Sequence, residues 1–218
     1  RDPEMSRGLG DVYKRQAVMK DGESTALRDL SSAAVRIARE QRGIGEAVAP
    51  RLFRDGRYQN TLLLSPPGGG KTTLLRILLG LERPDSGTVE GLAGKRISAV
   101  FQEDRLLEHL SAEGNLRFVL GREYDPKAAR ALLDRLGLPD TGAQPVREFS
   151  GGMKRRLALA RALLAPFDAL LLDESFTGLD RENRALALAC IRETAGDRPV
   201  LLVTHDPADA AGSPVVTL

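Results

Sequence analysis

Residues 61–80 read TLLLSPPGGGKTTLLRILLG. The apolar run at 61–64 is typical of a buried strand, and the spacing of apolar residues after the glycines predicts a helix over 71–79 that Gly80 ends. Glycines between a strand and a helix let successive backbone N–H groups approach phosphate oxygens, and the helix N-terminus attracts the anion. This order of elements therefore predicts a phosphate-binding loop; a glycine turn without a ligand is the alternative interpretation.

A triphosphate bound in this loop would give each side chain a role. Lys71 would reach the β- and γ-phosphates, and the hydroxyl of Thr72 would ligate Mg²⁺. Ser65 stands where the pattern G-x-x-x-x-G-K-[ST] has its first glycine. The residues expected to bind nucleotide in this loop are Ser65, Gly68, Gly69, Gly70, Lys71, Thr72 and Thr73.

The chain beyond this loop alternates apolar runs with helical patterns. Strands are expected at 97–101, 169–172, 200–203 and 215–218, and helices at 126–136, 150–164 and 181–194. Ser150 and Asp180 would cap two of those helices, and His109 is expected on a solvated helix. Strands that are apolar on both faces imply a parallel sheet covered by helices on both sides, so the predicted fold class is α/β.

Two carboxylates follow the apolar run at 170–172, namely Asp173 and Glu174. Acids at the carboxyl end of a parallel strand face the crevice in which ligands bind in open α/β sheets. Asp173 would hold Mg²⁺, and Glu174 would orient and deprotonate the attacking water. The alternative is a strand that simply ends in solvated acids.

A second glycine turn, FSGGM at 149–153, leads directly into a helical pattern. Its exposed N–H groups would form another anion-binding helix start, and two phosphate sites in one chain suggest that they serve different nucleotides. The alternative is an ordinary helix cap and turn.

The composition excludes several classes of protein. One cysteine in 218 residues rules out an internal disulfide framework and a cysteine-based zinc site, and we expect a reduced, intracellular protein. A formal charge of +2, no Trp and 4% aromatic residues argue against nucleic-acid binding. Because no apolar run approaches the ~18 residues that cross a bilayer, a role at a membrane would need a partner.

These motifs, in this order, resemble the ATP-binding cassette (ABC) ATPase family over residues 71–218. The segment 150–153 (SGGM) resembles the family's signature motif, and Gln102 resembles the Q-loop glutamine. Gly178–Asp180 resembles the D-loop, and Thr204–Asp206 resembles the switch-histidine segment.

The resemblance implies a RecA-like parallel sheet with a helical subdomain inserted at about 103–147. It implies that two such subunits, identical or paired, enclose two ATP molecules, each between Lys71 of one protomer and Ser150, Gly151 and Gly152 of the other. Catalysis would then involve Glu174, His205 and Gln102.

Further expectations rest on the same resemblance. The metal Mg²⁺ would be held by Thr72, Gln102 and Asp173, and Asp180 would lie at the nucleotide. The subunit would hydrolyse ATP at the cytoplasmic face of the cell membrane and power transport through transmembrane permease subunits. Residues 100–107 are similar to the ATPases of nitrate, sulfonate and taurine importers.

The N-terminal part of the chain departs from that family. Residues 1–16 resemble a translated sequencing adapter, and residues 17–76, which include Ser65-Pro66-Pro67, resemble stage III sporulation protein AA. We therefore divide the chain into a leader (1–16), an atypical segment (17–60) and an ABC-type domain (61–218). The competing interpretation is an ABC ATPase with a divergent N-terminal subdomain. As alternatives in function, the chain could be a fragment of a sporulation-type secretion ATPase or a chimeric nucleotide-binding module without turnover.

An ABC ATPase also carries an aromatic residue about 30 positions before its loop lysine, where it stacks on adenine. No aromatic residue lies between Tyr13 and Phe53, and Phe53 and Tyr58 stand too close to the loop. No stacking residue is therefore assigned.

Overall fold

The structure is a computed structural model that describes residues 61–64, 71–85, 89, 92, 94–139, 141, 143–206 and 215–217, together with four two-residue strands. The chain divides into two compact units, residues 1–41 and 42–218. In the first unit, β1 (Met19–Lys20) pairs antiparallel with β2 (Glu23–Ser24). In the second, β3 (Phe53–Arg54) pairs in the same way with β4 (Arg57–Tyr58).

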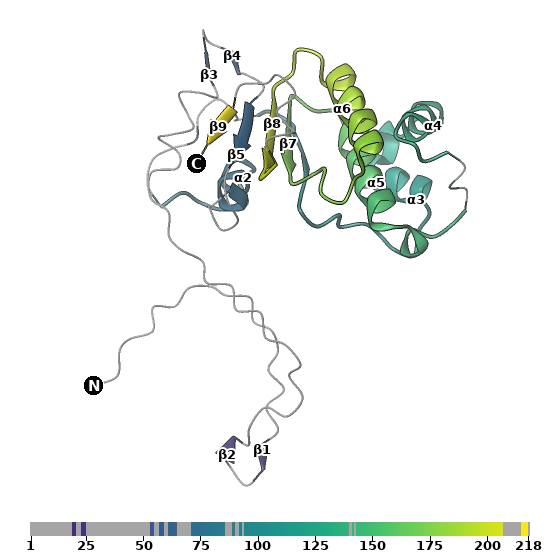
Figure 1. Cartoon of the computed structure of the whole chain (residues 1–218), viewed down its shortest axis with the longest axis horizontal. Helices are drawn as coiled ribbons and strands as arrows, with labels where there is room; N and C mark the ends of the chain where they lie inside the picture. The colour runs from purple at the N-terminus through teal and green to yellow at the C-terminus, as the bar shows by residue number, and fades with distance from the viewer. Residues whose placement is uncertain are drawn as a thin grey trace. The chain divides into compact units, whose positions relative to one another are not determined.

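A five-stranded parallel sheet forms the centre of the second unit (Figure 1). Its order is β6-β7-β8-β5-β9. The strands are β5 (Thr61–Leu64), β6 (Ile97–Val100), β7 (Ala169–Asp173), β8 (Val200–Thr204) and β9 (Val215–Thr217). Every neighbouring pair is parallel, so all five strands end at one edge of the sheet. The expected strands are confirmed to within one residue at their ends.

The helices agree with the sequence patterns wherever a pattern was clear. The α-helices are α2 (Lys71–Leu78), α3 (Ala112–Leu120), α4 (Pro126–Arg135), α5 (Gly151–Leu164) and α6 (Arg181–Ala195). Two short 3₁₀ helices are η1 (Gly121–Glu123) and η2 (Val146–Glu148). Ser150 and Asp180 cap α5 and α6 as expected, because their side chains accept the N–H of Met153 and Asn183.

One expectation for this region was wrong and one helix was missed. His109 is exposed, but it lies in the turn before α3 and not in a helix. The sequence pattern also gave no boundaries for α3, although Ser111 caps this helix by accepting the N–H of Gly114. The signal was a capping serine before a short apolar repeat that is interrupted by Gly114 and Asn115.

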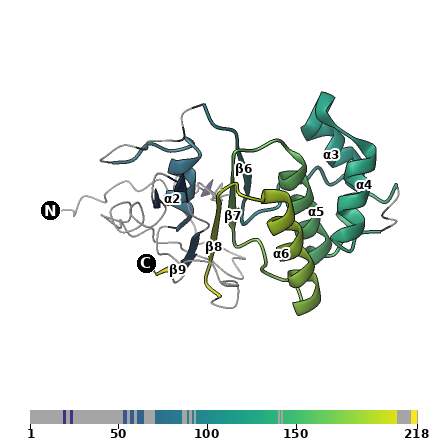
Figure 2. The same cartoon turned by 90° about the horizontal axis from the view of Figure 1, so that it is seen from above.

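Alternation along β7 explains the layers of the fold. Ala169 and Leu171 pack with Leu75 of α2 on one face of the sheet. Leu170 and Leu172 belong to the larger core formed with α5 and α6 on the other face. Successive strand residues point to opposite faces, so a fully apolar strand needs helices on both sides. Figure 2 shows the sheet between α2 and the α5–α6 layer.

Helices α3 and α4 pack against α5 on the side away from the sheet (Figure 2). Leu116, Leu133 and Leu157 are buried in this contact within the larger core. The segment between β6 and α5 therefore forms a helical layer that continues the core. Among the described residues, no helix has both the length and the apolar character needed to cross a bilayer.

Candidate nucleotide-hydrolysis site

The carboxyl ends of β7 and β8 carry the chemically active side chains. Parallel pairing sets Asp173 beside Val203, so the residue that follows each strand lies at the same edge of the sheet. Asp173 is only 2% exposed. Thr72, in the first turn of α2, donates a hydrogen bond to Oδ2 of Asp173 at 3.2 Å, across 101 residues of sequence. The tertiary structure thus brings the helix after the glycine loop onto the acidic strand end.

Glu174 adopts a backbone conformation that is uncommon for a residue with a side chain, with φ of 49°. Its N–H donates to the carbonyl of Val203 at 2.8 Å, which anchors the turn to β8. A left-handed conformation costs about 1 kcal/mol or more at a non-glycine residue, and such strain is often found at functional sites.

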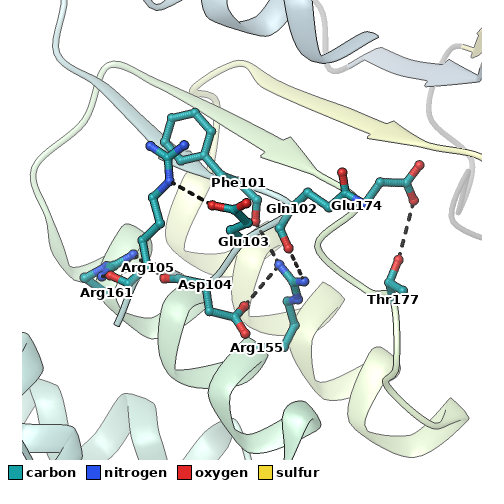
Figure 3. A network of polar contacts seen from close by, with 9 residues as sticks. All are labelled: Phe101, Gln102, Glu103, Asp104, Arg105, Arg155, Arg161, Glu174 and Thr177. Carbon is teal, nitrogen blue, oxygen red and sulfur yellow. Dashed lines mark hydrogen bonds and ion pairs between the residues drawn. The ribbon is translucent and has the colours of Figure 1, made fainter. Parts of the chain in front are cut away.

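The carboxylate of Glu174 contacts two neighbours. Nδ1 of His205 lies 2.8 Å from its Oε2. The hydroxyl of Thr177 lies 3.5 Å from the same oxygen (Figure 3). The Glu174 side chain is 11% exposed and that of His205 is 56% exposed. A largely buried acid held by a solvent-facing imidazole is suited to orienting a water and accepting its proton.

The segment after β8 is also fixed from α6. Nη1 of Arg184 contacts Oδ2 of Asp206 at 2.8 Å, and the Asp206 N–H donates to the Thr204 hydroxyl at 3.1 Å. His205 therefore lies between two residues whose positions are set by hydrogen bonds.

Gln102 follows β6 at the same edge of the sheet. Gln102 is exposed, and its backbone carbonyl accepts a hydrogen bond from Nη2 of Arg155 at 2.6 Å (Figure 3). In the part of the chain that the structure describes, the side chain of Gln102 forms no hydrogen bond with the carboxylate of Asp173 or of Glu174.

The second glycine turn lies beside the segment that leads into α6. A Cβ added at Gly152 would stand 3.6 Å from the carbonyl oxygen of Gly178 and 3.7 Å from the side chain of Leu179. The signature-like and D-loop-like segments are therefore neighbours within one chain.

Asp180 caps α6 with both carboxylate oxygens. Oδ1 accepts the backbone N–H of Asn183 at 2.8 Å, and Oδ2 accepts its side-chain amide at 2.8 Å. These bonds, the backbone one first, hold the pKa of Asp180 below its ordinary value of 3.8. Asp180 therefore serves as a helix cap at the edge of the expected nucleotide site.

The predicted site residues thus fall into two groups. Thr72, Asp173, Glu174 and His205 converge at the ends of β7 and β8. Ser150, Gly151, Gly152 and Asp180 lie at the starts of α5 and α6. Lys71 begins α2 and Thr73 follows in its first turn; the side chain of Lys71 and residues Ser65, Gly68, Gly69 and Gly70 lie outside the described residues.

The donor set at the strand end fits Mg²⁺. The Thr72 hydroxyl and the Asp173 carboxylate are adjacent oxygen ligands, and Mg²⁺ prefers one or two protein oxygens together with substrate phosphates. In the part of the chain that the structure describes, no cluster of three or more His, Cys, Asp or Glu side chains could hold a metal on its own. Substrate phosphates and water would complete the coordination of a Mg²⁺ held by these two oxygens.

Comparison with protein families decides the identity of this fold. The family model for the ABC transporter matches residues 56–177, which is more than half of the chain. The chain belongs to the ABC transporter family. The match confirms the P-loop NTPase fold and the ATP-binding class that the sequence predicts. ABC ATP-binding proteins are ATP hydrolases.

Several curated ABC proteins are similar to this chain. It is 36% identical to the taurine import ATP-binding protein TauB of Pseudomonas aeruginosa, covering 83% of this chain and 74% of TauB. It is 43% identical to the aliphatic sulfonates import ATP-binding protein SsuB 1 of Rhodococcus jostii, covering 67% and 62%. It is 37% identical to the molybdenum import ATP-binding protein ModC of Mesorhizobium japonicum, covering 76% and 50%.

A solved structure of a bacterial Atm1-family ABC exporter with ATP bound shares the fold, with a TM-score of 0.65 and 23% identity. The alignment covers 73% of this chain and 32% of the exporter chain. The present chain therefore spans about a third of that exporter, and half to three quarters of the curated relatives named above.

The comparisons do not support the two resemblances of the N-terminal part. The ABC match begins at residue 56, which is upstream of Arg76, where we placed the end of the sporulation-like segment. The relatives named above are all ABC proteins, so neither the sporulation resemblance of 17–76 nor the adapter resemblance of 1–16 gains support.

Proposed function

We propose that this chain is the ATP-hydrolysing subunit of an ABC transporter and that hydrolysis occurs at the ends of β7 and β8. The observation that carries the proposal is the convergence of Thr72 on Asp173 with His205 on Glu174 at one edge of the sheet. Residues from three separate parts of the sequence meet where a triphosphate bound at the N-terminus of α2 would present its γ-phosphate.

Each side chain has a role in this proposal. Glu174 accepts the proton of the attacking water, and its Oε2 is oriented for this by His205 and Thr177. The largely exposed ring of His205 also faces the γ-phosphate position, and because a neutral imidazole carries one N–H, it would donate to that phosphate in place of the Glu174 carboxylate. Lys71, Ser65 and Gly68 to Gly70 bind the phosphates through the loop and the start of α2, and Thr73 extends that binding turn.

Mg²⁺ is assigned to Thr72, Asp173 and Gln102. Thr72 and Asp173 already lie within hydrogen-bond distance, and Gln102 follows the neighbouring strand β6 at the same sheet edge. When bound, the metal would neutralise charge that develops on the phosphate oxygens.

The second group of residues requires a second subunit. Ser150, Gly151 and Gly152 start α5 beside Gly178, so the N-terminus of α5 can attract an anion, and Asp180, whose carboxylate caps α6, lies at the neighbouring helix start. We assign them to the nucleotide held by the loop of a paired subunit, in a dimer whose two sites are equivalent by two-fold symmetry.

The relatives support a proposal for the transport partners and the location. TauB and SsuB 1 are named as import ATP-binding proteins for taurine and aliphatic sulfonates. We propose that this chain likewise binds transmembrane permease subunits at the cytoplasmic face of the membrane and powers import of a sulfonate or a related anion such as nitrate. We retain 1–16, 17–60 and 61–218 as the proposed segments, with the helical insertion at about 103–147.

Release of phosphate from ATP by the purified chain tests the proposal. Glu174→Gln keeps the size of the side chain and removes the base, so hydrolysis should fall by roughly 10²–10⁴-fold while MgATP binding persists. Glu123→Gln is the matched control, because Glu123 is exposed in η1. Equal rates for Glu174→Gln and the unaltered protein would reject Glu174 as the base, and the absence of any hydrolysis or ATP binding would reject the function itself.

A further inference from the structure

Two arginines of α5 contact the segment 101–105, which connects β6 to the helical layer. Arg155 donates from Nη1 to the carbonyl of Phe101 at 2.8 Å and from Nη2 to that of Gln102 at 2.6 Å. Arg161 donates from Nη2 to the carbonyl of Asp104 at 2.9 Å and from Nη1 to that of Arg105 at 2.8 Å. Four backbone carbonyls of this segment are therefore bound by one helix (Figure 3).

Side chains of the same segment reinforce this attachment. Oδ1 of Asp104 lies 3.1 Å from Nη1 of Arg155, and the guanidinium of Arg105 lies 4.3 Å from the centroid of the Phe101 ring. Burial raises the pKa of Asp104, and the neighbouring charges of Arg155, Arg161 and Lys154 oppose that rise. The Arg155 side chain is 11% exposed, so its contacts are made away from bulk water.

The segment 101–105 is irregular and lies outside any helix or strand. Phe101 to Arg105 have left the ladder of β6, and Arg105 has a left-handed φ of 46°. Carbonyls outside a helix or sheet need other donors when water is excluded, and the guanidinium groups supply them. Arg155 binds the carbonyl of Gln102 and that of Phe101, the residue before it.

Helix α5 begins at the signature-like turn. Ser150 caps the helix, and Arg155 lies in the same helix only five residues later. An α-helix is stiff over this length, so a shift at its N-terminus is carried to the Arg155 backbone. The guanidinium then connects that helix start to the backbone of Gln102.

We propose that Arg155 is a positioning residue that fixes Gln102 at the hydrolysis site and couples its position to the signature-like end of α5. This inference rests on the proposed function, because it acts through Gln102. In the paired arrangement, the Ser150 turn of each subunit would contact the nucleotide held by the loop of its partner. Helix α5 would then link that nucleotide to Gln102 of its own subunit, which lies at the other nucleotide.

The forked shape of the guanidinium is essential to this role. Its two terminal nitrogens bind two successive carbonyls, and Nη1 also contacts the Asp104 carboxylate. A lysine ammonium is a single centre on a flexible stem and cannot reproduce this planar fork. Arg155→Lys therefore keeps the positive charge and loses the fixed geometry.

The test compares Arg155→Met and Arg155→Lys with Lys154→Met. Lys154 neighbours Arg155 on α5, but its ammonium contacts Glu108 at 2.7 Å and none of the four carbonyls. For each protein, kcat and KM for MgATP are measured together with hydrogen–deuterium exchange of a peptide containing 101–105 and the thermal midpoint of unfolding.

We expect Arg155→Met to lower kcat at least tenfold, to change KM for ATP less than threefold, and to accelerate exchange in 101–105. Arg155→Lys should also lower kcat, by a smaller factor, while KM changes less than threefold. Lys154→Met should match the unaltered protein in kcat, KM and exchange. If Arg155→Met does not fold, the Arg155→Lys protein decides, since it keeps the charge beside Asp104.

Two results would overturn the inference. In the folded Arg155 variants, an unaltered exchange rate in 101–105 would show that the guanidinium does not hold the segment. Faster exchange with an unaltered kcat would show that the held segment does not position Gln102. A different failure, in which the unaltered protein hydrolyses no ATP, removes the proposed function and this inference with it.

Discussion

The hydroxyl of Thr72 donates to Oδ2 of Asp173 at 3.2 Å, and this bond joins the first turn of α2 to the end of β7. It brings the helix after the glycine loop onto the acidic strand end, where a metal shared with a nucleotide would be held.

Removing either partner of this pair should weaken metal use. We expect Thr72→Ala and Asp173→Asn to raise the Mg²⁺ concentration for half-maximal hydrolysis by about tenfold or more, because each removes one oxygen ligand. A titration of phosphate release against Mg²⁺ measures this. Asp168→Asn is the control, since Asp168 precedes β7, at the opposite end of the strand, where it binds the Arg96 N–H at 2.7 Å. Identical titrations for all four proteins would contradict the assignment.

The contact between His205 and Glu174 predicts a selective loss of turnover. His205→Ala removes a polar group 2.8 Å from the Glu174 carboxylate, and hydrolysis should fall by roughly 10²–10³-fold as when one charge-stabilising donor is lost. ATP binding, followed by fluorescence of a labelled analogue, should change little. His109→Ala supplies the control, since His109 is exposed in the turn before α3. A parental rate in His205→Ala would argue against this role.

Arg156 is expected to contribute to stability more than to hydrolysis. Its Nη1 lies within 2.8 Å of the carbonyls of Leu136 and Gly137 and 2.7 Å from Oδ1 of Asn183, which ties α4, α5 and α6 together. Burial lowers the pKa of Arg156, and Asp180 opposes this. Because Arg156→Met leaves these acceptors without their donor, the free energy of unfolding should fall by about 2–4 kcal/mol in denaturant titrations. A loss under 0.5 kcal/mol would be inconsistent with such a junction.

Gly137 tests the same junction from the other side. It has φ of +67°, and an added Cβ would lie 2.7 Å from Nη1 of Arg156. Gly196 also has a positive φ, of +55°, but an added Cβ there would meet nothing within 4 Å. Gly137→Ala should therefore lower the thermal midpoint more than Gly196→Ala, which carries backbone strain alone. Equal midpoints would show that the guanidinium can move aside without cost.

Asp180 predicts a pH dependence of stability with a defined sign. Its pKa in the folded protein lies below the ordinary value of 3.8, because the N–H of Asn183 stabilises the charged form. The stabilisation is therefore fully present above about pH 4 and is lost as the pH falls through the folded pKa. Unfolding midpoints of the unaltered protein should fall more steeply below pH 4 than those of Asp180→Asn. Parallel curves would exclude a stabilising charge at this cap.

Local sequence patterns were sufficient for the elements that frame the site. The apolar run of β7 and its terminal acids, the serine before α5 and the aspartate before α6 each have a local physical cause. Helix α3 was missed because Gly114 and Asn115 interrupt its pattern, while its stability comes from burial of Leu116 against α5. A local pattern cannot report packing that other parts of the chain supply.

The sequence by itself determined the strands of the parallel sheet, the helices α2, α4, α5 and α6, the two glycine turns and the chemical identity of the residues at the strand ends. Only the tertiary structure decided that Oε2 of Glu174 meets His205 and that Arg155 binds the backbone of Gln102. The reason is physical: hydrophobic periodicity and capping act over a few residues, whereas these contacts join residues 31 and 53 positions apart. Their geometry exists only after the sheet and its helices have packed.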